Sequence, residues 1–288
     1  GPDGLQLRRP DSATATLLPI ASVPADHVSD LAGELVEGDL FAGDPSDPCV
    51  DTAIALLGAS EARVFSVCKV DAETGAPAWR DAAVEHVVPL VPPTPITSGP
   101  MIGDVNGDGQ LDLVVGTEHQ AYVAYGNGRE LAAARPWEAR TNGSDSLTPI
   151  SMPLALGDYT GDGPVDLVYP GGFLVSQRAL DGTLEYRDVG RGFGELWTAA
   201  RVADLNGNGK LDVIAISDTK LDIEFWNGTG TTSLNPAAIP TQRPVRELVV
   251  GDFDGDLIQD LAYTQIVPPA EPTEVIVSFG TPAGVPMP

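Results

Sequence analysis

Basic side chains are scarce in this sequence of 288 residues: 16 Lys and Arg stand against 41 Asp and Glu, a formal net charge of −25. Nucleic-acid phosphates and anionic lipid headgroups are bound by clustered Lys and Arg. We therefore expect no nucleic-acid partner and no anionic membrane partner. The acidity is not that of a disordered tail, because 42% of the residues are hydrophobic and apolar runs recur along the chain. A sizeable buried core is predicted.

Long apolar segments are also missing. No stretch approaches the roughly 18 apolar residues that a helix needs to cross a bilayer. The first residues lack the charged and then apolar form of a secretory signal peptide. These absences predict no membrane insertion, and we interpret the sequence as a soluble segment that has been processed or excised.

Cysteine is limited to Cys49 and Cys68. Neither a second cysteine pair nor a nearby histidine cluster is present to complete a zinc site. In an oxidising compartment the two thiols are expected to form a disulfide, which would stabilise the fold by roughly 3 kcal/mol through the entropy of the unfolded chain. Two buried free thiols are the alternative.

Catalytic signatures are absent as well. The sequence contains no G-x-S-x-G, no H-E-x-x-H and no G-x-x-x-x-G-K-[ST] motif. The histidines, His27, His86 and His119, are scattered, so we expect surface positions or local hydrogen bonds for them. An enzyme is not predicted.

Glycine and proline are abundant, at 32 and 26 residues. This punctuation favours many short strands joined by tight turns. Four segments of the chain align without gaps: residues 103–113, 157–167, 203–213 and 251–261. Their first aspartates, Asp104, Asp158, Asp204 and Asp252, are 54, 46 and 48 residues apart. A period of about 50 residues is the size of one four-stranded propeller blade.

The flanks of each segment repeat too. Alternating apolar residues precede the first aspartate, and continuous apolar runs such as 113–115 and 213–215 follow the last one. Continuous runs are typical of strands covered on both faces. A further strand is predicted in each repeat, over residues 122–125, 173–175, 223–226 and 275–279, and a fourth can follow it.

A degenerate copy of the repeat is predicted near residue 38. Gly38, Asp39 and Leu40 open like the motif, Asp44 and Asp51 resemble its later positions, and residues 53–57 and 63–67 are predicted strands. The spacing is not kept, so we interpret this loop as rebuilt. We therefore predict an all-β fold, a β-propeller of four-stranded blades over residues 36–288, with repeats starting near 38, 103, 157, 203 and 251. Residues 1–35 form an N-terminal segment that could contribute strands to ring closure.

The repeated loops are rich in oxygen ligands. Counted from the first aspartate, positions 1, 3, 5 and 9 are Asp104, Asn106, Asp108 and Asp112; Asp158, Thr160, Asp162 and Asp166; Asp204, Asn206, Asn208 and Asp212; and Asp252, Asp254, Asp256 and Asp260. Position 7, which offers a backbone carbonyl, is Gln110, Pro164, Lys210 or Ile258. Ca²⁺ takes six to eight oxygen ligands of these kinds. About four calcium sites are predicted, although Leu257 stands where the other loops have a second glycine.

An EF-hand is the nearest alternative. Its twelfth position is a bidentate Glu, whereas the corresponding residues here are Val115, Tyr169, Ala215 and Tyr263. The flanks also have the periodicity of strands. An ordinary Asp/Asn/Gly turn would explain one loop, but not four in register.

The segment at residue 103 reads Gly-Asp-x-Asn-Gly-Asp-Gly-x-x-Asp-Leu. This segment and the three that align with it resemble FG-GAP (VCBS-type) repeats, the blades of integrin-alpha-like β-propellers. The resemblance covers residues 98–281 clearly and 36–70 weakly. It implies Ca²⁺ bound by the residues at positions 1, 3, 5 and 9, and an extracellular or cell-surface setting. Such propellers usually have seven blades and about five are visible, so either some blades are too degenerate to see or the chain is part of a longer polypeptide.

Three functions are compatible with this resemblance. The first is a calcium-binding adhesion or interaction module with a protein or glycan ligand. The second is a carbohydrate-binding or polysaccharide-acting propeller, with Trp79 and Trp137 as candidates for a ligand surface and Trp197 and Trp226 as core residues. The third is a structural subunit of a larger surface assembly. Asn142 and Asn227 begin formal glycosylation sequons.

Overall fold

A computed structural model describes most of the chain and contains only β-structure there. The described residues are 5–10, 17–23, 36–141, 146–151, 153–170, 172–179, 182, 184–189, 197–217, 220–226, 234–241, 244–265, 274–282 and 284–287. Within these ranges no helix occurs, and so none that is long and apolar enough to cross a membrane. The predicted all-β class is confirmed.

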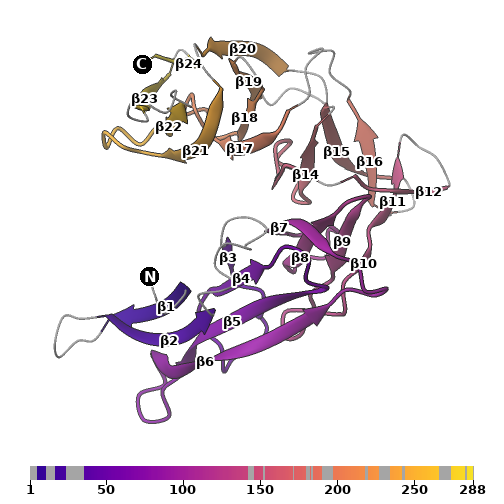
Figure 1. The fold of residues 1–288 in the computed structure, drawn as a ribbon, viewed down its shortest axis with the longest axis vertical. Helices are drawn as coiled ribbons and strands as arrows, with labels where there is room; N and C mark the ends of the chain where they lie inside the picture. Colours follow the sequence, from indigo (N-terminus) through magenta and orange to yellow (C-terminus); the bar gives the residue numbers. More distant parts are fainter. Residues whose placement is uncertain are drawn as a thin grey trace. The chain divides into compact units, whose positions relative to one another are not determined.

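The chain divides into two compact units: residues 1–138 with 149–152, and residues 139–148 with 153–288. The first unit holds a two-stranded hairpin and two four-stranded sheets (Figure 1). The hairpin pairs β1 (Leu5–Pro10) with β2 (Leu17–Val23). The first blade consists of β3 (Val36–Gly38), β4 (Asp51–Ala55), β5 (Glu61–Val70) and β6 (Pro77–Pro89). The second consists of β7 (Ile96–Gly103), β8 (Asp112–Thr117), β9 (Ala121–Ala124) and β10 (Arg135–Pro136).

The second unit holds three further blades. The third consists of β13 (Ala155–Gly157), β14 (Asp166–Tyr169), β15 (Gly172–Arg178) and β16 (Leu184–Asp188). Its sheet is extended by β11 (Glu138–Thr141), parallel to β16, and β12 (Leu147–Pro149). The fourth consists of β17 (Ala199–Ala203), β18 (Asp212–Ile216), β19 (Lys220–Trp226) and β20 (Leu234–Pro240). The fifth consists of β21 (Val245–Gly251), β22 (Asp260–Gln265), β23 (Glu274–Thr281) and β24 (Gly284–Met287).

Strands that follow one another in a blade are antiparallel neighbours, as expected for propeller blades. The five sheets therefore confirm the four-stranded blades predicted from the sequence, including the degenerate copy at residue 38. All five share one register at the loop: Gly38, Gly103, Gly157, Ala203 and Gly251 pair with Asp51, Asp112, Asp166, Asp212 and Asp260, respectively.

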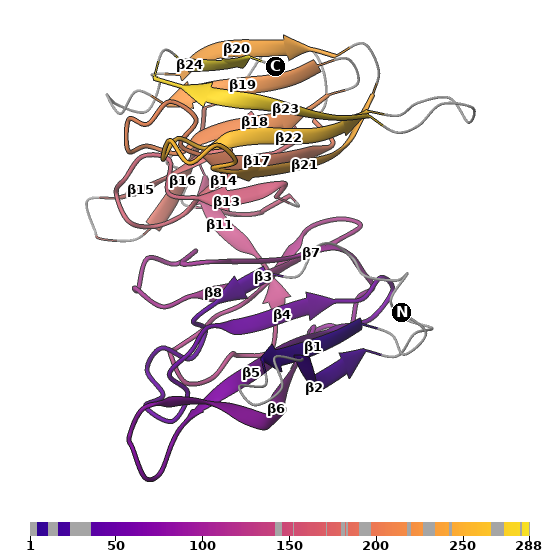
Figure 2. The ribbon, with the colours of Figure 1, turned by 90° about the vertical axis from the view of Figure 1, so that its left-hand side faces the viewer.

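The core lies between blades, which explains the continuous apolar runs. In β18, Val213 and Ala215 pack with third-blade residues, whereas Ile214 and Ile216 pack with residues of the fifth blade. Figure 2 shows the fourth and fifth blades as adjacent layers within their unit. A third apolar cluster joins the first and second blades. A strand covered on both faces has no solvent side that would select polar residues.

The tryptophans divide differently from the prediction. Trp197 and Trp226 are buried, which confirms them as core residues. The assignment of Trp137 to a ligand surface is wrong, because its side chain is only 1% exposed. Its backbone receives the N–H of Ile150 and donates to the carbonyl of Ala121, so polar neighbours in the sequence hid an interior position. His27, Asn142, Asn227 and the side chain of Trp79 lie outside the described residues.

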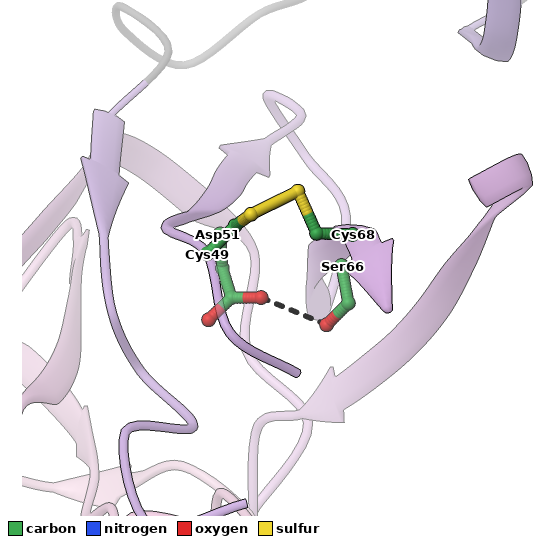
Figure 3. Close-up of a disulfide and its surroundings, with 4 residues drawn as sticks. All are labelled: Cys49, Asp51, Ser66 and Cys68. Carbon is green, nitrogen blue, oxygen red and sulfur yellow. Dashed lines mark hydrogen bonds between the residues drawn. A yellow bond between two sulfur atoms is a disulfide. The ribbon is translucent and has the colours of Figure 1, made fainter. Parts of the chain in front are cut away.

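Cys49 and Cys68 form a disulfide, with their Cα atoms 5.7 Å apart (Figure 3). The predicted disulfide is therefore confirmed, and the alternative of two free thiols is wrong. The bond connects the loop that precedes β4 to strand β5. It closes a chain segment with a sequence separation of 19.

Removing this cross-link with the double variant Cys49→Ser/Cys68→Ser should lower the free energy of unfolding by about 3 kcal/mol, the loop-closure entropy of a segment of this length. Denaturant unfolding with and without a reducing agent measures it. The reductant should shift the wild-type midpoint and leave that of the double variant in place. A wild-type midpoint indifferent to reduction would contradict the prediction.

Candidate metal-binding loops

Four acidic loops join the first and second strands of blades two to five. We name them by their first residue: the Asp104 loop (104–112), the Asp158 loop (158–166), the Asp204 loop (204–212) and the Asp252 loop (252–260). All four lie within the described residues, each between two strands rather than two helices, so the EF-hand alternative is wrong.

The aspartate at position 1 organises each loop. Asp104 Oδ1 accepts hydrogen bonds from the N–H groups of Gly107 and Asp108 at 2.7 and 3.1 Å, and its Oδ2 accepts one from Gly109 at 2.8 Å. The N–H groups of positions 5 and 6 bind the first aspartate in the other three loops as well. The carboxylate thus curls the backbone around itself, as Asp side chains do in turns.

Leu257 follows the same path although it is not glycine. Its N–H donates to Asp252 Oδ2 at 3.0 Å, equivalent to the bond that Gly109 donates to Asp104. Its φ is +71°, close to the +85° of Gly109. The departure at position 6 therefore leaves the loop geometry intact and puts a leucine in the left-handed region, at a conformational cost.

The aspartate at position 9 connects the loop to the rest of its blade. Asp112 is fully buried; its Oδ2 accepts the N–H of Val105 at 2.9 Å and its Oδ1 accepts the N–H of Gly126 at 2.8 Å. The same pair of bonds, from position 2 and from a residue in the third strand or just beyond it, is made to Asp166, Asp212 and Asp260. This residue joins three segments of one blade.

Burial makes three of these carboxylates, those of Asp112, Asp166 and Asp212, hard to ionise. It raises the pKa of Asp112 and Asp212 to about 7 and that of Asp166 to about 6, against the lowering effect of their hydrogen bonds. The negative charges of Asp108 and Asp104 raise the pKa of Asp112 further. A nearby positive charge would favour the ionised form.

Ser176 was not predicted to belong to a loop site. Its buried hydroxyl lies 2.9 Å from Asp166 Oδ1, 3.2 Å from the Pro164 carbonyl and 3.3 Å from Asp162 Oδ1. These are positions 9, 7 and 5 of the Asp158 loop, so three of its predicted ligand oxygens converge on one point. A hydroxyl can donate only one hydrogen to them. The motif could not predict Ser176, because this residue lies on β15, ten residues beyond Asp166.

The Asp252 loop brings carboxylates closest together. One oxygen from each of Asp252, Asp254 and Asp260 lies within 4.8 Å of the others, and among the described residues this is the one group of three or more acidic, His or Cys side chains that does so. Desolvation, followed by the charges of Asp256, Asp260 and Asp252, raises the pKa of Asp254. Close carboxylates of this kind repel each other unless a cation lies between them.

The rebuilt loop of the first blade keeps the position-9 interaction (Figure 3). Asp51 is fully buried; its Oδ2 accepts the N–H of Leu40 at 3.0 Å and its Oδ1 accepts the hydroxyl of Ser66 at 2.8 Å. Burial raises the pKa of Asp51 to about 7, and the negative charges of Asp47 and Asp39 act in the same direction. Asp51 is therefore the structural equivalent of Asp112.

A serine, a histidine and an aspartate also meet in this blade, but not as a nucleophilic triad. Ser66 Oγ is 3.3 Å from His86 Nε2, yet it donates its hydrogen to Asp51 and the residue is only 1% exposed. An activated nucleophile needs access to its substrate and a base that receives its proton. The ring of His86 contacts that of Phe41 at a tilt of 41°, with 4.5 Å between the ring centroids, and His119 is exposed, in line with the local and surface roles expected.

Comparisons with known proteins find a repeat family and solved structures to which this chain is similar. A family model described as FG-GAP-like repeat matches residues 104–169 and 204–263. A solved lectin of Agrocybe aegerita, described for specific recognition of non-reducing terminal N-acetylglucosamine, is 18% identical over 99% of this chain and 73% of its own, with a TM-score of 0.56. The V. cholerae biofilm matrix protein Bap1 is 17% identical over 86% of this chain and 37% of its own, with a TM-score of 0.40. Among curated proteins no match is found.

Replacing Leu257 with glycine should stabilise the chain by about 0.5–1 kcal/mol, because the left-handed strain is relieved at some cost in unfolded-state entropy. The side chain is 88% exposed, so little packing is lost. Leu257→Ala, which keeps the strain, is the matched control and should be nearly neutral. Denaturant unfolding in a chelator measures both; a destabilised glycine variant would contradict the assignment of strain.

Replacing Asp112 with alanine should destabilise the chain by roughly 2–6 kcal/mol, because the buried N–H groups of Val105 and Gly126 lose their acceptor. Asp108→Ala, in the exposed part of the same loop, is the control and should cost less than about 1 kcal/mol. Both are measured by denaturant unfolding in excess chelator, so that no cation contributes. Equal losses in the two variants would disprove the connecting role of Asp112.

Proposed function

We propose that this chain of FG-GAP-like repeats is a calcium-stabilised propeller module that acts by binding a partner in an extracellular or cell-surface setting. The observation that carries the calcium assignment is the convergence of Asp252, Asp254 and Asp260, with oxygens within 4.8 Å of one another. In this proposal the cation holds the loops and takes no part in catalysis.

The donor set supports a hard cation. The oxygens at positions 1, 3, 5, 7 and 9 come from carboxylates, amides, one hydroxyl and backbone carbonyls, with no sulfur or imidazole in the four loops. Such sets suit Ca²⁺ rather than zinc or copper. Bound Ca²⁺ would place a positive charge beside the buried position-9 carboxylates and so favour their ionised form.

The loops should differ in affinity. Side-chain carboxylates number four in the Asp252 loop, three each in the Asp104 and Asp158 loops, and two in the Asp204 loop. Affinity in oxygen-ligand sites rises with ligand charge. We therefore expect the Asp252 loop to be occupied first and the Asp204 loop last.

A binding role suits a fold whose polar residues are committed to structure. Each oxygen of the position-9 residue Asp112 accepts a backbone N–H, and the Ser66 hydroxyl is buried against Asp51. Loops carried by a rigid β-scaffold commonly provide binding surfaces. The exposed faces of the four acidic loops are the surface we assign to this role.

The carbohydrate-binding alternative is less well supported. The likeness to the Agrocybe aegerita lectin shows a shared fold at 18% identity, and it does not transfer that protein's sugar specificity. Trp137, a tryptophan assigned to a sugar surface, is buried. Binding of the calcium-loaded chain to defined glycans on an array would reverse this preference.

Calcium should raise the melting temperature and chelation should lower it, since each site contributes about 2.7 kcal/mol when free Ca²⁺ is a hundredfold above its Kd. Asp252→Asn should remove the tightest site in a calorimetric titration with Ca²⁺. Glu73→Gln, which removes one exposed acid from the turn between β5 and β6, is the charge-matched control. A melt that is the same in excess EDTA and in Ca²⁺ would falsify the assignment.

A further inference from the structure

The first blade carries an acidic group that the four loops do not account for. Asp51 lies twelve positions after Asp39, whereas Asp112 lies eight positions after Asp104, so the repeat motif is lost in the sequence. The strand register restores the correspondence: Gly38 pairs with Asp51 as Gly103 pairs with Asp112. Asp39 and Asp51 therefore occupy positions 1 and 9 of a loop with four additional residues.

Asp47 occupies the place of position 5. It precedes Asp51 by four residues, as Asp108 precedes Asp112. The electrostatic pattern repeats too: the charges of Asp47 and Asp39 act on Asp51 as those of Asp108 and Asp104 act on Asp112. The additional residues are thus inserted between positions 1 and 5.

Two carboxylate oxygens in this group are buried without a hydrogen-bond partner. They are Oδ1 of Asp39 and Oδ1 of Asp47, and the whole of Asp47 is only 6% exposed. An unpartnered carboxylate oxygen shielded from water is costly and calls for an ion or another ligand. Nothing comparable is required of Asp51, whose two oxygens each accept a hydrogen bond.

We infer that the first blade holds a divalent cation between Asp39, Asp47 and Asp51, in a loop that no longer spells the repeat motif. Oxygen-only ligands select a hard cation such as Ca²⁺ or Mn²⁺. The three carboxylates do not lie within 4.8 Å of one another, and neither do those of Asp104, Asp108 and Asp112. Binding therefore requires Asp39 and Asp47 to turn toward Asp51.

The disulfide sets the position of this group. Cys49 lies midway between Asp47 and Asp51 and is bonded to Cys68 on β5. The cross-link therefore holds both acids beside the strand that carries Ser66, the partner of Asp51. Reduction of the disulfide should weaken the cation site.

Arg80 offers a different explanation for the unpartnered acids. Its Nε is buried without a hydrogen-bond partner, and its charge acts on Asp44 and His86. A guanidinium turned toward Asp47 would replace the cation. The two explanations differ in whether a divalent cation binds beside His86.

Mn²⁺ is the probe, because it is paramagnetic and broadens nearby NMR signals with a steep dependence on distance. The full chain has three histidines. The His86 ring lies 3.3 Å from the Ser66 hydroxyl that bonds Asp51, whereas His119 lies in the turn at the opposite end of β8 from the Asp104 loop. Mn²⁺ should remove the His86 imidazole signal from the spectrum and spare that of His119.

Asp47→Asn should retain the His86 signal at Mn²⁺ concentrations that remove it from the wild type. Asp44→Asn, an acid of the same loop bonded to Ser46, and Asp104→Asn, in the neighbouring blade, should behave as the wild type. Thermal unfolding checks that Asp47→Asn is folded. If it is not, Asp39→Asn takes its place. With the disulfide reduced, more Mn²⁺ should be needed to remove half of the His86 signal.

A wild-type His86 signal that persists in Mn²⁺ would overturn the inference and leave Arg80 as the counter-ion. The inference also fails if Asp47→Asn loses the signal as the wild type does, or if Asp104→Asn retains it. If the reduced chain needed no more Mn²⁺ than the oxidised chain to lose half of the His86 signal, the role assigned to the disulfide would be disproved. This test is separate from that of the other four loops. A melting temperature that does not respond to Ca²⁺ would contradict the proposed function, and Mn²⁺ could still broaden the His86 signal.

Discussion

A buried aspartate that accepts two hydrogen bonds from separate segments of its own blade is the interaction on which this structure depends. In the second to fifth blades the donors are the N–H of loop position 2 and an N–H in the third strand or just beyond it. In the first blade Asp51 also accepts the N–H of position 2, Leu40, but its second donor is the hydroxyl of Ser66. Because each carboxylate joins three segments, the loop cannot shift without leaving buried N–H groups unpaired.

The same aspartate creates the electrostatic problem that the loops have to solve. A carboxylate away from water, beside other carboxylates, is held partly protonated near neutral pH, as the raised pKa values of Asp112 and Asp212 indicate. Twelve of the 41 acidic residues lie in the four loops. The cation that we propose would relieve the burial cost and the mutual repulsion together. Part of the acidity of the chain is thus concentrated in these loops, and we propose the same role for the acids in the rebuilt loop of the first blade.

Much of this could be predicted because it follows from short-range patterns. The repeat period indicated the blades, continuous apolar runs indicated strands buried on both faces, and the alternating oxygens indicated the loops. Contacts that depend on strand register could not be predicted. Asp51 is equivalent to Asp112 only once Gly38 and Gly103 are seen to pair alike, since four inserted residues hide the match. Ser176 reaches its loop from β15, and Trp137 is buried through backbone pairing that its polar neighbours conceal.

The blades and loops are also coupled within each unit. Position 2, whose N–H binds the buried aspartate, carries a side chain that packs with the next blade: Leu40 joins residues of the second blade, and Leu205 joins residues of the fifth. The loops touch directly as well, because Gln259 donates its N–H to the Asp204 carbonyl at 3.3 Å and the Ile258 side chain lies over Gly207. A cation that fixes one loop therefore also fixes the surface on which the neighbouring blade rests. Stability and the shape of the loop surface are set by the same contacts, so neither can change alone.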